Sequence, residues 1–223
     1  MAEARRINHP YSLAFALNFA AYIAILGRDV AATAAAAGEL MAISNAQGFQ
    51  QWLAAGAIAL GWVMAHLGDA EQGDAQILQV LGMYDAMGFG LFRTQYAAMR
   101  VDALRIAGRP EDALAAIDEA LAFAGSTEER AFLPQLHYLR GEVLVELGRP
   151  DEGEREFEAA VTIGRAAGSN LQALRAAVSW VRSTEDSGGA DTARAALAEI
   201  LAGLFEGGDA PEIEEARQLL SGG

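Results

Sequence analysis

Residues 134–167 read PQLHYLRGEVLVELGRPDEGEREFEAAVTIGRAA, and this stretch decides the fold. It predicts two helices joined by a tight turn at residues 148–150, Gly-Arg-Pro. Glycine supplies the left-handed backbone that ends a helix, and proline is tolerated in the first turn of the next one. Gly141 and Gly153, on either side of the turn, leave room for the two helices to approach closely. The stretch therefore predicts a helical hairpin.

The same pattern recurs along the whole chain at intervals of about 40 residues. The predicted turn glycines are Gly27, Gly68, Gly108, Gly148 and Gly188. Five residues after them stand the small residues Ala32, Gly73, Ala113, Gly153 and Ala193. Twelve residues after them stand Glu39, Val80, Ala120, Ala160 and Ile200. Glu39 departs from the apolar type, so the first hairpin fits the pattern poorly.

The prediction is an all-α protein of about five helical hairpins in a single domain, 1–223. We expect the hairpins at about 10–45, 49–87, 91–125, 131–167 and 170–205. Their first helices are expected at about 10–26, 49–67, 91–107, 131–147 and 170–184, and their second helices at about 29–45, 70–87, 110–125, 150–167 and 190–205. A short capping helix is expected at 210–221, because Ile213, Ala216, Leu219 and Leu220 fall on one helical face.

Composition excludes several kinds of chemistry. The chain has no Cys and no Lys, which removes thiol catalysis, a phosphate-loop lysine and a lysine Schiff base. Its formal net charge of −14 disfavours nucleic acid and anionic membranes as partners. The apolar run 11–26 is too short for a typical membrane span and is better interpreted as a buried helix. We expect no cofactor, no membrane association and a cytoplasmic location.

The hairpin pattern resembles the tetratricopeptide repeat, although the period here is about six residues longer than the usual 34. The resemblance implies a right-handed α-α superhelix in which the first helix of each hairpin lines a concave groove. Partners of such proteins bind in that groove.

Longer stretches resemble one particular group of repeat proteins. HPYSLAFALNFAAYI (residues 9–23), GFQQWLAAGAIALGWVMAHLGD (48–69) and LHYLRGEVLVELG (136–148) are similar to the C-terminal region of bacterial adenylate/guanylate cyclase–ATPase fusions and related regulator ATPases. So are SNLQALRAAVSWVRS (169–183) and LFEGGDAPEIEEARQLL (204–220). The resemblance implies a repeat module that follows an ATPase domain and senses a ligand or partner. This chain contains neither an ATPase nor a cyclase domain.

The candidate binding residues are those that the first helices would turn toward the groove. They are Trp62, His66, Gln95, Met99, Asp102, Arg105, Gln135, Tyr138, Glu142, Arg175 and Arg182. Aromatic and Arg side chains are the types that dominate binding surfaces. Their mixed charges suggest a polar partner, a peptide or a small molecule. Alternatively, the charges pair with one another across neighbouring helices.

Two smaller clusters allow alternative interpretations. His137 and Arg140 lie one helical turn apart and could both face an anion, or could be structural beside Glu142. His66 with Asp69, Glu71 and Asp74 loosely resembles a metal cluster, but it lacks a second His or a calcium-loop spacing. We interpret that stretch as a helix end followed by a capping turn.

The leading functional prediction is a non-enzymatic, tetratricopeptide-like module for protein–protein interaction or regulatory sensing in a bacterial signalling system. A small-molecule inducer sensor is the alternative, and a helical-repeat enzyme is a third possibility that the missing Lys and Cys disfavour. The first two hairpins are apolar and nearly free of charge. Their uncapped end is expected to pack against a preceding ATPase or cyclase domain, or against a second copy of the chain.

Overall fold

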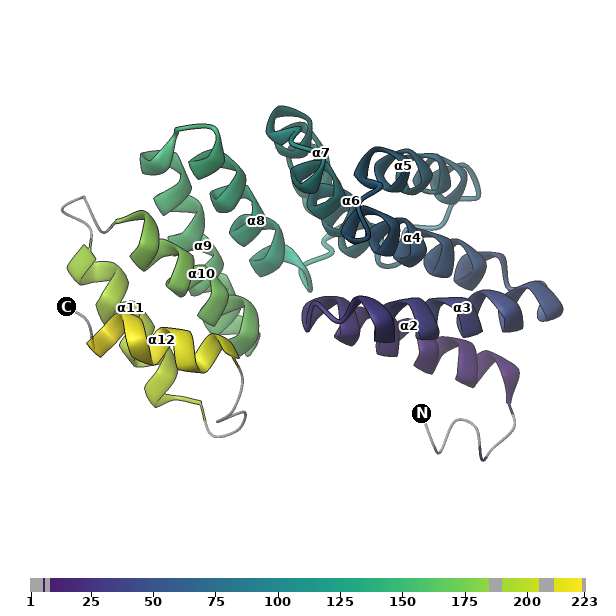
Figure 1. Cartoon of the computed structure of the whole chain (residues 1–223), viewed down its shortest axis with the longest axis horizontal. Helices are drawn as coiled ribbons and strands as arrows, with labels where there is room; N and C mark the ends of the chain where they lie inside the picture. The colour runs from purple at the N-terminus through teal and green to yellow at the C-terminus, as the bar shows by residue number, and fades with distance from the viewer. Residues whose placement is uncertain (1–5, 7–8, 185–189, 205–210, 222–223) are drawn as a thin grey trace. The chain divides into compact units, whose positions relative to one another are not determined.

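The protein is all-helical, as predicted. The computed structural model describes residues 6, 9–184, 190–204 and 211–221, and within these residues it contains helices and no strands. The helices are α2 (Pro10–Leu26), α3 (Val30–Gln47), α4 (Gln50–His66), α5 (Ala70–Ala86), α6 (Arg93–Ile106), α7 (Pro110–Thr127), α8 (Leu133–Glu146), α9 (Pro150–Ala167), α10 (Asn170–Ser183), α11 (Ala190–Ala202) and α12 (Pro211–Ser221) (Figure 1).

The chain forms two compact units, residues 1–109 and 110–223. Unit 1 (residues 1–109) has two layers of helices. The first helices of its hairpins, α2, α4 and α6, pack side by side in one layer, and α3 and α5 pack against them as a second layer.

Unit 2 (residues 110–223) follows the same rule. Helices α8, α10 and α12 form one layer, and α7, α9 and α11 form the other. Since α12 joins the first-helix layer, it occupies the place that a further first helix would take beside α10.

The predicted helices agree closely with the observed ones, except that two helices begin later than predicted. We expected the third and fourth first helices to begin near residues 91 and 131, but α6 begins at Arg93 and α8 at Leu133. The residue before α6, Phe92, has φ 64°, a left-handed conformation that cannot belong to a right-handed helix. The bulky Phe gave no sequence signal for such a conformation.

The first predicted turn is wrong by one residue. Gly27 has φ −80°, whereas Arg28 has φ 56° and is the left-handed residue of that turn. Gly68, Gly108 and Gly148 have φ 102°, 71° and 72° at their turns. Arg28 is therefore the residue equivalent to these glycines. The prediction placed the turn at Gly27 because glycine is the usual residue in a left-handed conformation. Gly188 lies outside the described residues.

The corrected position of the turn removes the misfit of the first hairpin. Counting from Arg28 instead of Gly27, the positions five, nine and twelve residues later hold Thr33, Ala37 and Leu40. All three are fully buried, as the packing pattern requires. Glu39 is only half-buried and lies beside the buried position. The first hairpin thus follows the same packing rule as the others.

Glycines allow the paired helices to approach closely. A Cβ atom added to Gly73 on α5 would lie 2.5 Å from the carbonyl oxygen of Gly61 on α4. In unit 2, a Cβ atom on Gly141 would lie 2.4 Å from the ring of Phe157. These contacts leave no room for a side chain, so the glycines set the separation of the two helices in each pair.

Within the described residues, no helix combines the length and apolarity that a bilayer span requires. The apolar run at the start of the chain forms α2, whose Ala14, Leu17, Ala21 and Ile25 are buried in the core of unit 1.

Candidate partner-binding face

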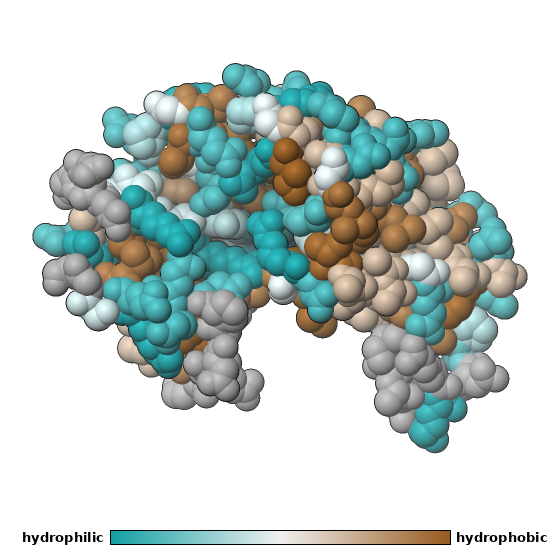
Figure 2. All heavy atoms as spheres, viewed as in Figure 1, coloured by the Kyte–Doolittle hydropathy of each residue, from teal (hydrophilic) through white to brown (hydrophobic). Residues whose placement is uncertain are grey.

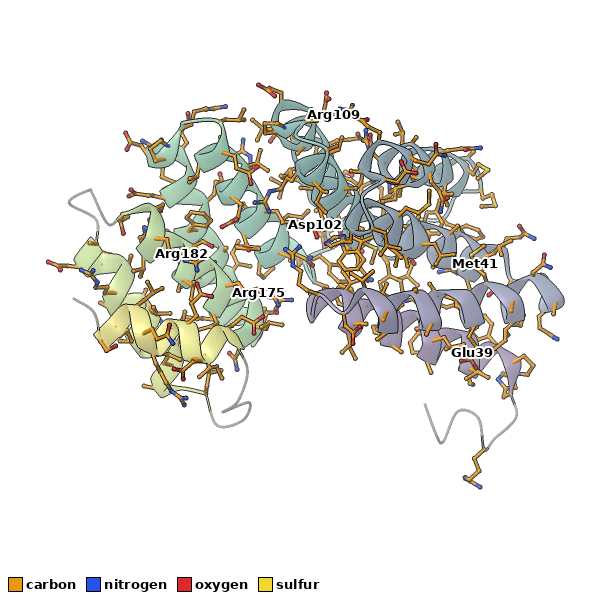
Figure 3. All side chains as sticks on the ribbon, viewed as in Figure 1. Glu39, Met41, Asp102, Arg109, Arg175 and Arg182 are labelled. Atoms are coloured by element: carbon orange, nitrogen blue, oxygen red, sulfur yellow. The ribbon has the colours of Figure 1, made fainter. Side chains whose placement is uncertain are left out.

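Three side chains of unit 1 lie around the carboxylate of a fourth residue, Asp102. We call them the Asp102 cluster: Arg28, Trp62, His66 and Asp102. Oδ2 of Asp102 accepts a hydrogen bond from Trp62 Nε1 at 2.9 Å and one from the Arg28 guanidinium at 3.0 Å. Arg28 follows α2, Trp62 lies on α4 and Asp102 on α6 (Figure 3 labels Asp102). The cluster therefore ties the layer together at one end.

His66 completes the cluster. Its ring stacks on Trp62 with a centroid separation of 3.8 Å. Its Nδ1 lies 3.0 Å from the Trp62 carbonyl oxygen, and because a carbonyl can only accept, Nδ1 carries a proton. Nε2 then faces Asp102 Oδ2 at 4.0 Å, which is too long for a hydrogen bond.

Exposure divides the cluster into a buried and an accessible part. Trp62 is fully buried, and the Asp102 side chain is only 13% exposed. The Arg28 side chain is 51% exposed. Because a charged hydrogen bond from Arg28 to a nearly buried carboxylate is strong, the Arg28 head group is fixed in position while it still faces solvent. Fixed, exposed Arg side chains are well suited to contact a partner.

An aromatic row on α2 lies in the same layer. Tyr11, Phe15 and Phe19 are four residues apart and share one helical face. Tyr11 and Phe15 pack edge-on against Trp52, with centroids 5.9 and 5.8 Å apart, yet both remain nearly half exposed. Phe19 packs edge-on against Phe92 at 5.6 Å. The row therefore presents rigid apolar surface from a helix that carries no charged residue.

Gln95, a predicted binding residue, lies inside unit 1. It is 1% exposed, and its amide nitrogen and oxygen have no hydrogen-bond partner among the described residues. Gln95, Met99 and Asp102 follow one face of α6, and Met99 is also buried. A buried amide without hydrogen-bond partners lowers the stability of the folded chain by roughly 1–3 kcal/mol. Gln95 is therefore less favourable at this position than an apolar side chain of similar size.

The other predicted residues lie in different settings. In unit 1, Arg105 is half-buried on α6. In unit 2, Gln135, Tyr138 and Glu142 are half-buried along α8. Arg175 and Arg182 on α10 form ion pairs with Glu212 and Glu215 of α12. The structure therefore brings together Trp62, His66 and Asp102, and it places α12 against the two predicted Arg residues of α10.

His137 and Arg140 contact carboxylates. His137 Nδ1 lies 2.7 Å from Glu156, and Arg140 bonds both Glu156 and Asp118, the latter at 2.9 Å. Burial alone would raise the pKa of the Glu156 carboxyl, but the hydrogen bonds and positive charge from His137 and Arg140 outweigh it and lower that pKa. The two side chains therefore pair with carboxylates of the neighbouring helices α7 and α9.

The acidic residues near His66 do not gather around it. Asp74 binds Arg100 at 2.8 Å and Arg109 at 3.0 Å, and Arg109 also binds Glu71 at 3.1 Å. Among the described residues, no group of three or more His, Asp or Glu side chains is arranged to hold a metal ion.

Sequence reasoning missed Arg28 and the α2 aromatic row. A strict spacing of 40 residues back from Gly68 would have found Arg28 at the first turn. The four-residue spacing of Tyr11, Phe15 and Phe19 is visible in the sequence, within the apolar run 11–26 that predicts a buried helix.

No protein-family model matches the chain, and no curated protein is significantly similar to it. The arrangement of the described side chains therefore carries the functional argument.

Proposed function

We propose that the chain is a non-catalytic, tetratricopeptide-like module: a right-handed superhelix of five hairpins with a period of about 40 residues. It binds a protein or peptide partner through the first-helix layer of unit 1, in a bacterial signalling or transcription-regulator system. The signalling context rests on the resemblance to the repeat regions of cyclase–ATPase fusions. The location of the binding face rests on the side chains of α2, α4 and α6.

One observation carries the proposed location. The half-exposed Arg28 is held by Asp102, and the half-exposed Tyr11 and Phe15 are held against Trp52, all in one layer. Aromatic and Arg side chains that are already ordered lose little entropy when a partner binds. Their chemistry fits a partner with apolar side chains next to a carboxylate.

Two kinds of partner could bind the exposed aromatic row of α2. One is a preceding ATPase or cyclase domain, and the other is a second copy of this chain. Light scattering at high protein concentration separates them, because self-association through α2 would give a dimer that Phe15→Ala weakens.

The proposal is tested by selecting peptides from a displayed library against the full chain. Selected peptides should lose roughly tenfold or more in affinity for Phe15→Ala and Arg28→Ala chains. Leu78→Ala is the matched control, because Leu78 is 50% exposed on α5 in the other layer. Equal loss of affinity in all three variants, or loss in Leu78→Ala alone, would contradict the proposed face.

The alternative, a small-molecule sensor, is favoured by one residue, Gln95. If its buried amide serves a ligand, Gln95→Leu should remove the response to that ligand. If Gln95 has no such role, Gln95→Leu should stabilise the chain by about 1 kcal/mol or more, since it removes a buried amide without partners. Urea unfolding of the variant measures this change.

A further inference from the structure

The C-terminal helix α12 is an amphipathic helix docked on unit 2. Its Ile213 and Ala216 are buried, and Leu219 and Leu220 pack against the same apolar cluster. That cluster includes Leu174, Ala177 and Val181 of α10. Helix α12 packs on both α10 and α11 (Figure 1).

Two ion pairs accompany this apolar contact. Arg175 pairs with Glu212, and Arg182 pairs with Glu215. Arg175 and Arg182 are seven residues apart, so they lie on one face of α10 (Figure 3 labels both). Burial of Glu212 opposes its ionisation, but the hydrogen bonds from Arg175 and the backbone outweigh it and lower the pKa of Glu212.

Helix α10 differs in charge from its surroundings. Unit 2 contains 22 acidic residues and 9 Arg, a net charge of 9 − 22 = −13. Helix α10 contains two Arg and no acidic residue, whereas the described helices α7, α8, α9, α11 and α12 are each net negative. Among the described helices of unit 2, α10 is therefore the one with a net positive charge, and α12 contacts it.

Helix α12 has 11 residues, and a helix of that length is marginal in water without tertiary contacts. The helix is therefore stabilised by the face on which it docks. The face contacts two carboxylates, Glu212 and Glu215, and the buried Ile213 that lies between them in the sequence.

We infer that this face of α10 is a helix-docking site, occupied in cis by α12, whose external ligand is an acidic amphipathic helix of a partner protein. The ligand helix carries the Glu-Ile-x-Glu-Ala pattern seen at residues 212–216. The inference rests on the proposed function, in which first helices bind partners, and it extends that function to unit 2. Helix α12 then acts as a competitor that such a partner must displace.

The test uses the full chain and a fluorescein-labelled synthetic peptide copying residues 211–221. A chain with Glu212→Arg and Glu215→Arg has a repelled α12 and an open α10 face. By fluorescence anisotropy the peptide should bind this chain roughly tenfold or more tightly than it binds the wild-type chain, whose own α12 competes. Ile213→Ala, which loosens α12 through its apolar contact, should expose the face in the same way if the charge variant does not fold.

Matched charge reversals supply the control. A peptide with Glu212 and Glu215 changed to Arg should fail to bind the open chain, and should bind a chain with Arg175→Glu and Arg182→Glu. Phe15→Ala and Arg28→Ala should leave binding of this peptide to α10 unchanged. The proposed binding face of unit 1 and the docking site on α10 can therefore be refuted independently of each other.

Three results would overturn the inference. The first is no binding of the wild-type peptide to either opened chain, and the second is equal binding of the wild-type and reversed peptides. The third is a wild-type dimer that the peptide dissociates, because the occupant would then be α12 of a second copy.

Discussion

Units 1 and 2 build the same two-layered arrangement of helices with different chemistry. Unit 1 has 8 acidic residues and 7 Arg, a net charge of 7 − 8 = −1, against −13 for unit 2. Its largest fully buried side chains include Trp52, Trp62, Tyr84 and Tyr96. On the face shown in Figure 2, more of the residues of unit 1 than of unit 2 are hydrophobic.

Unit 2 has fewer large, fully buried aromatic side chains, and ion pairs link its helices as they do those of unit 1. Arg140 links α8 to α7 and α9 through Asp118 and Glu156, and Arg165 links α9 to α11 through Glu199. Small apolar residues fill much of its core, including Ala160, Ala173, Ala176 and Ala177. The comparison teaches that close helix contacts at glycine and other small residues, together with ion pairs between helices, occur in both units, whereas large buried aromatic side chains are concentrated in unit 1.

The largest expected loss of stability follows from removing a buried aromatic side chain of unit 1. Trp62→Ala removes a fully buried ring and a donor to Asp102, and should lower the free energy of unfolding by about 3–5 kcal/mol. Arg140→Ala, the ionic counterpart in unit 2, should cost only about 1 kcal/mol. Urea unfolding followed by circular dichroism compares the two variants. Equal losses would contradict the proposed difference between the units.

Helix separation should be the next most sensitive property. Gly73→Ala forces a Cβ atom against the Gly61 carbonyl oxygen and should destabilise the chain by about 1–3 kcal/mol. Gly82→Ala on the same helix has open space and should stabilise it by roughly 0.5–1 kcal/mol. Thermal unfolding of both variants measures the opposite signs, and a stabilising Gly73→Ala would refute the close approach of α4 and α5.

Acid should weaken unit 2 through Glu156 and Glu212. Both carboxyls have a pKa below the ordinary Glu value in the folded chain. Their stabilisation is therefore fully present above roughly pH 4.3, the ordinary value, and is lost as pH falls through the folded pKa. Carbon-detected NMR titration should find both midpoints below that value. In Glu156→Gln the loss of stability on acidification should be smaller than in the wild-type chain, and an unchanged loss would contradict the role of Glu156.

The smallest effect is expected for an exposed ion pair. Arg165 and Glu199 have side chains that are 50% and 62% exposed, although they are only 2.7 Å apart. Arg165→Ala should change the free energy of unfolding by no more than about 0.5 kcal/mol, because solvent screens such pairs. A loss as large as that of Arg140→Ala would show that the ion pairs act as a network.

Much of the fold was predictable because the residues that mark turns and the small residues that allow close helix packing occur together in the sequence. Gly148 and Pro150 marked a turn, and Gly141 faced Phe157 across it, so one stretch revealed the hairpin. Arg28 was missed because its residue type gives no signal for a left-handed conformation, although the 40-residue spacing points to its position, and its side chain is held by Asp102 of α6. The partners of Arg175 and Arg182 were also unpredictable, since they lie 37 and 33 residues later on a helix that was expected only as a cap.

The candidate site was predictable only in part. Trp62, His66 and Asp102 were selected from their position in the hairpins and do meet. Gln95 was selected by the same rule, but it is buried because α6 packs directly against α4 and α5. Helical spacing predicts on which face of a helix a residue lies. Whether the residue is exposed depends on how closely the neighbouring helices approach that face.

The most direct test of the partner-binding face is amide hydrogen exchange of the full chain with and without a selected peptide. Binding to the first-helix layer should slow exchange in α2 and at the Asp102 cluster, and should leave α3 and the outer side of α5 unchanged. Slowed exchange confined to α3 and α5 would place the partner on the opposite layer and contradict the proposed function.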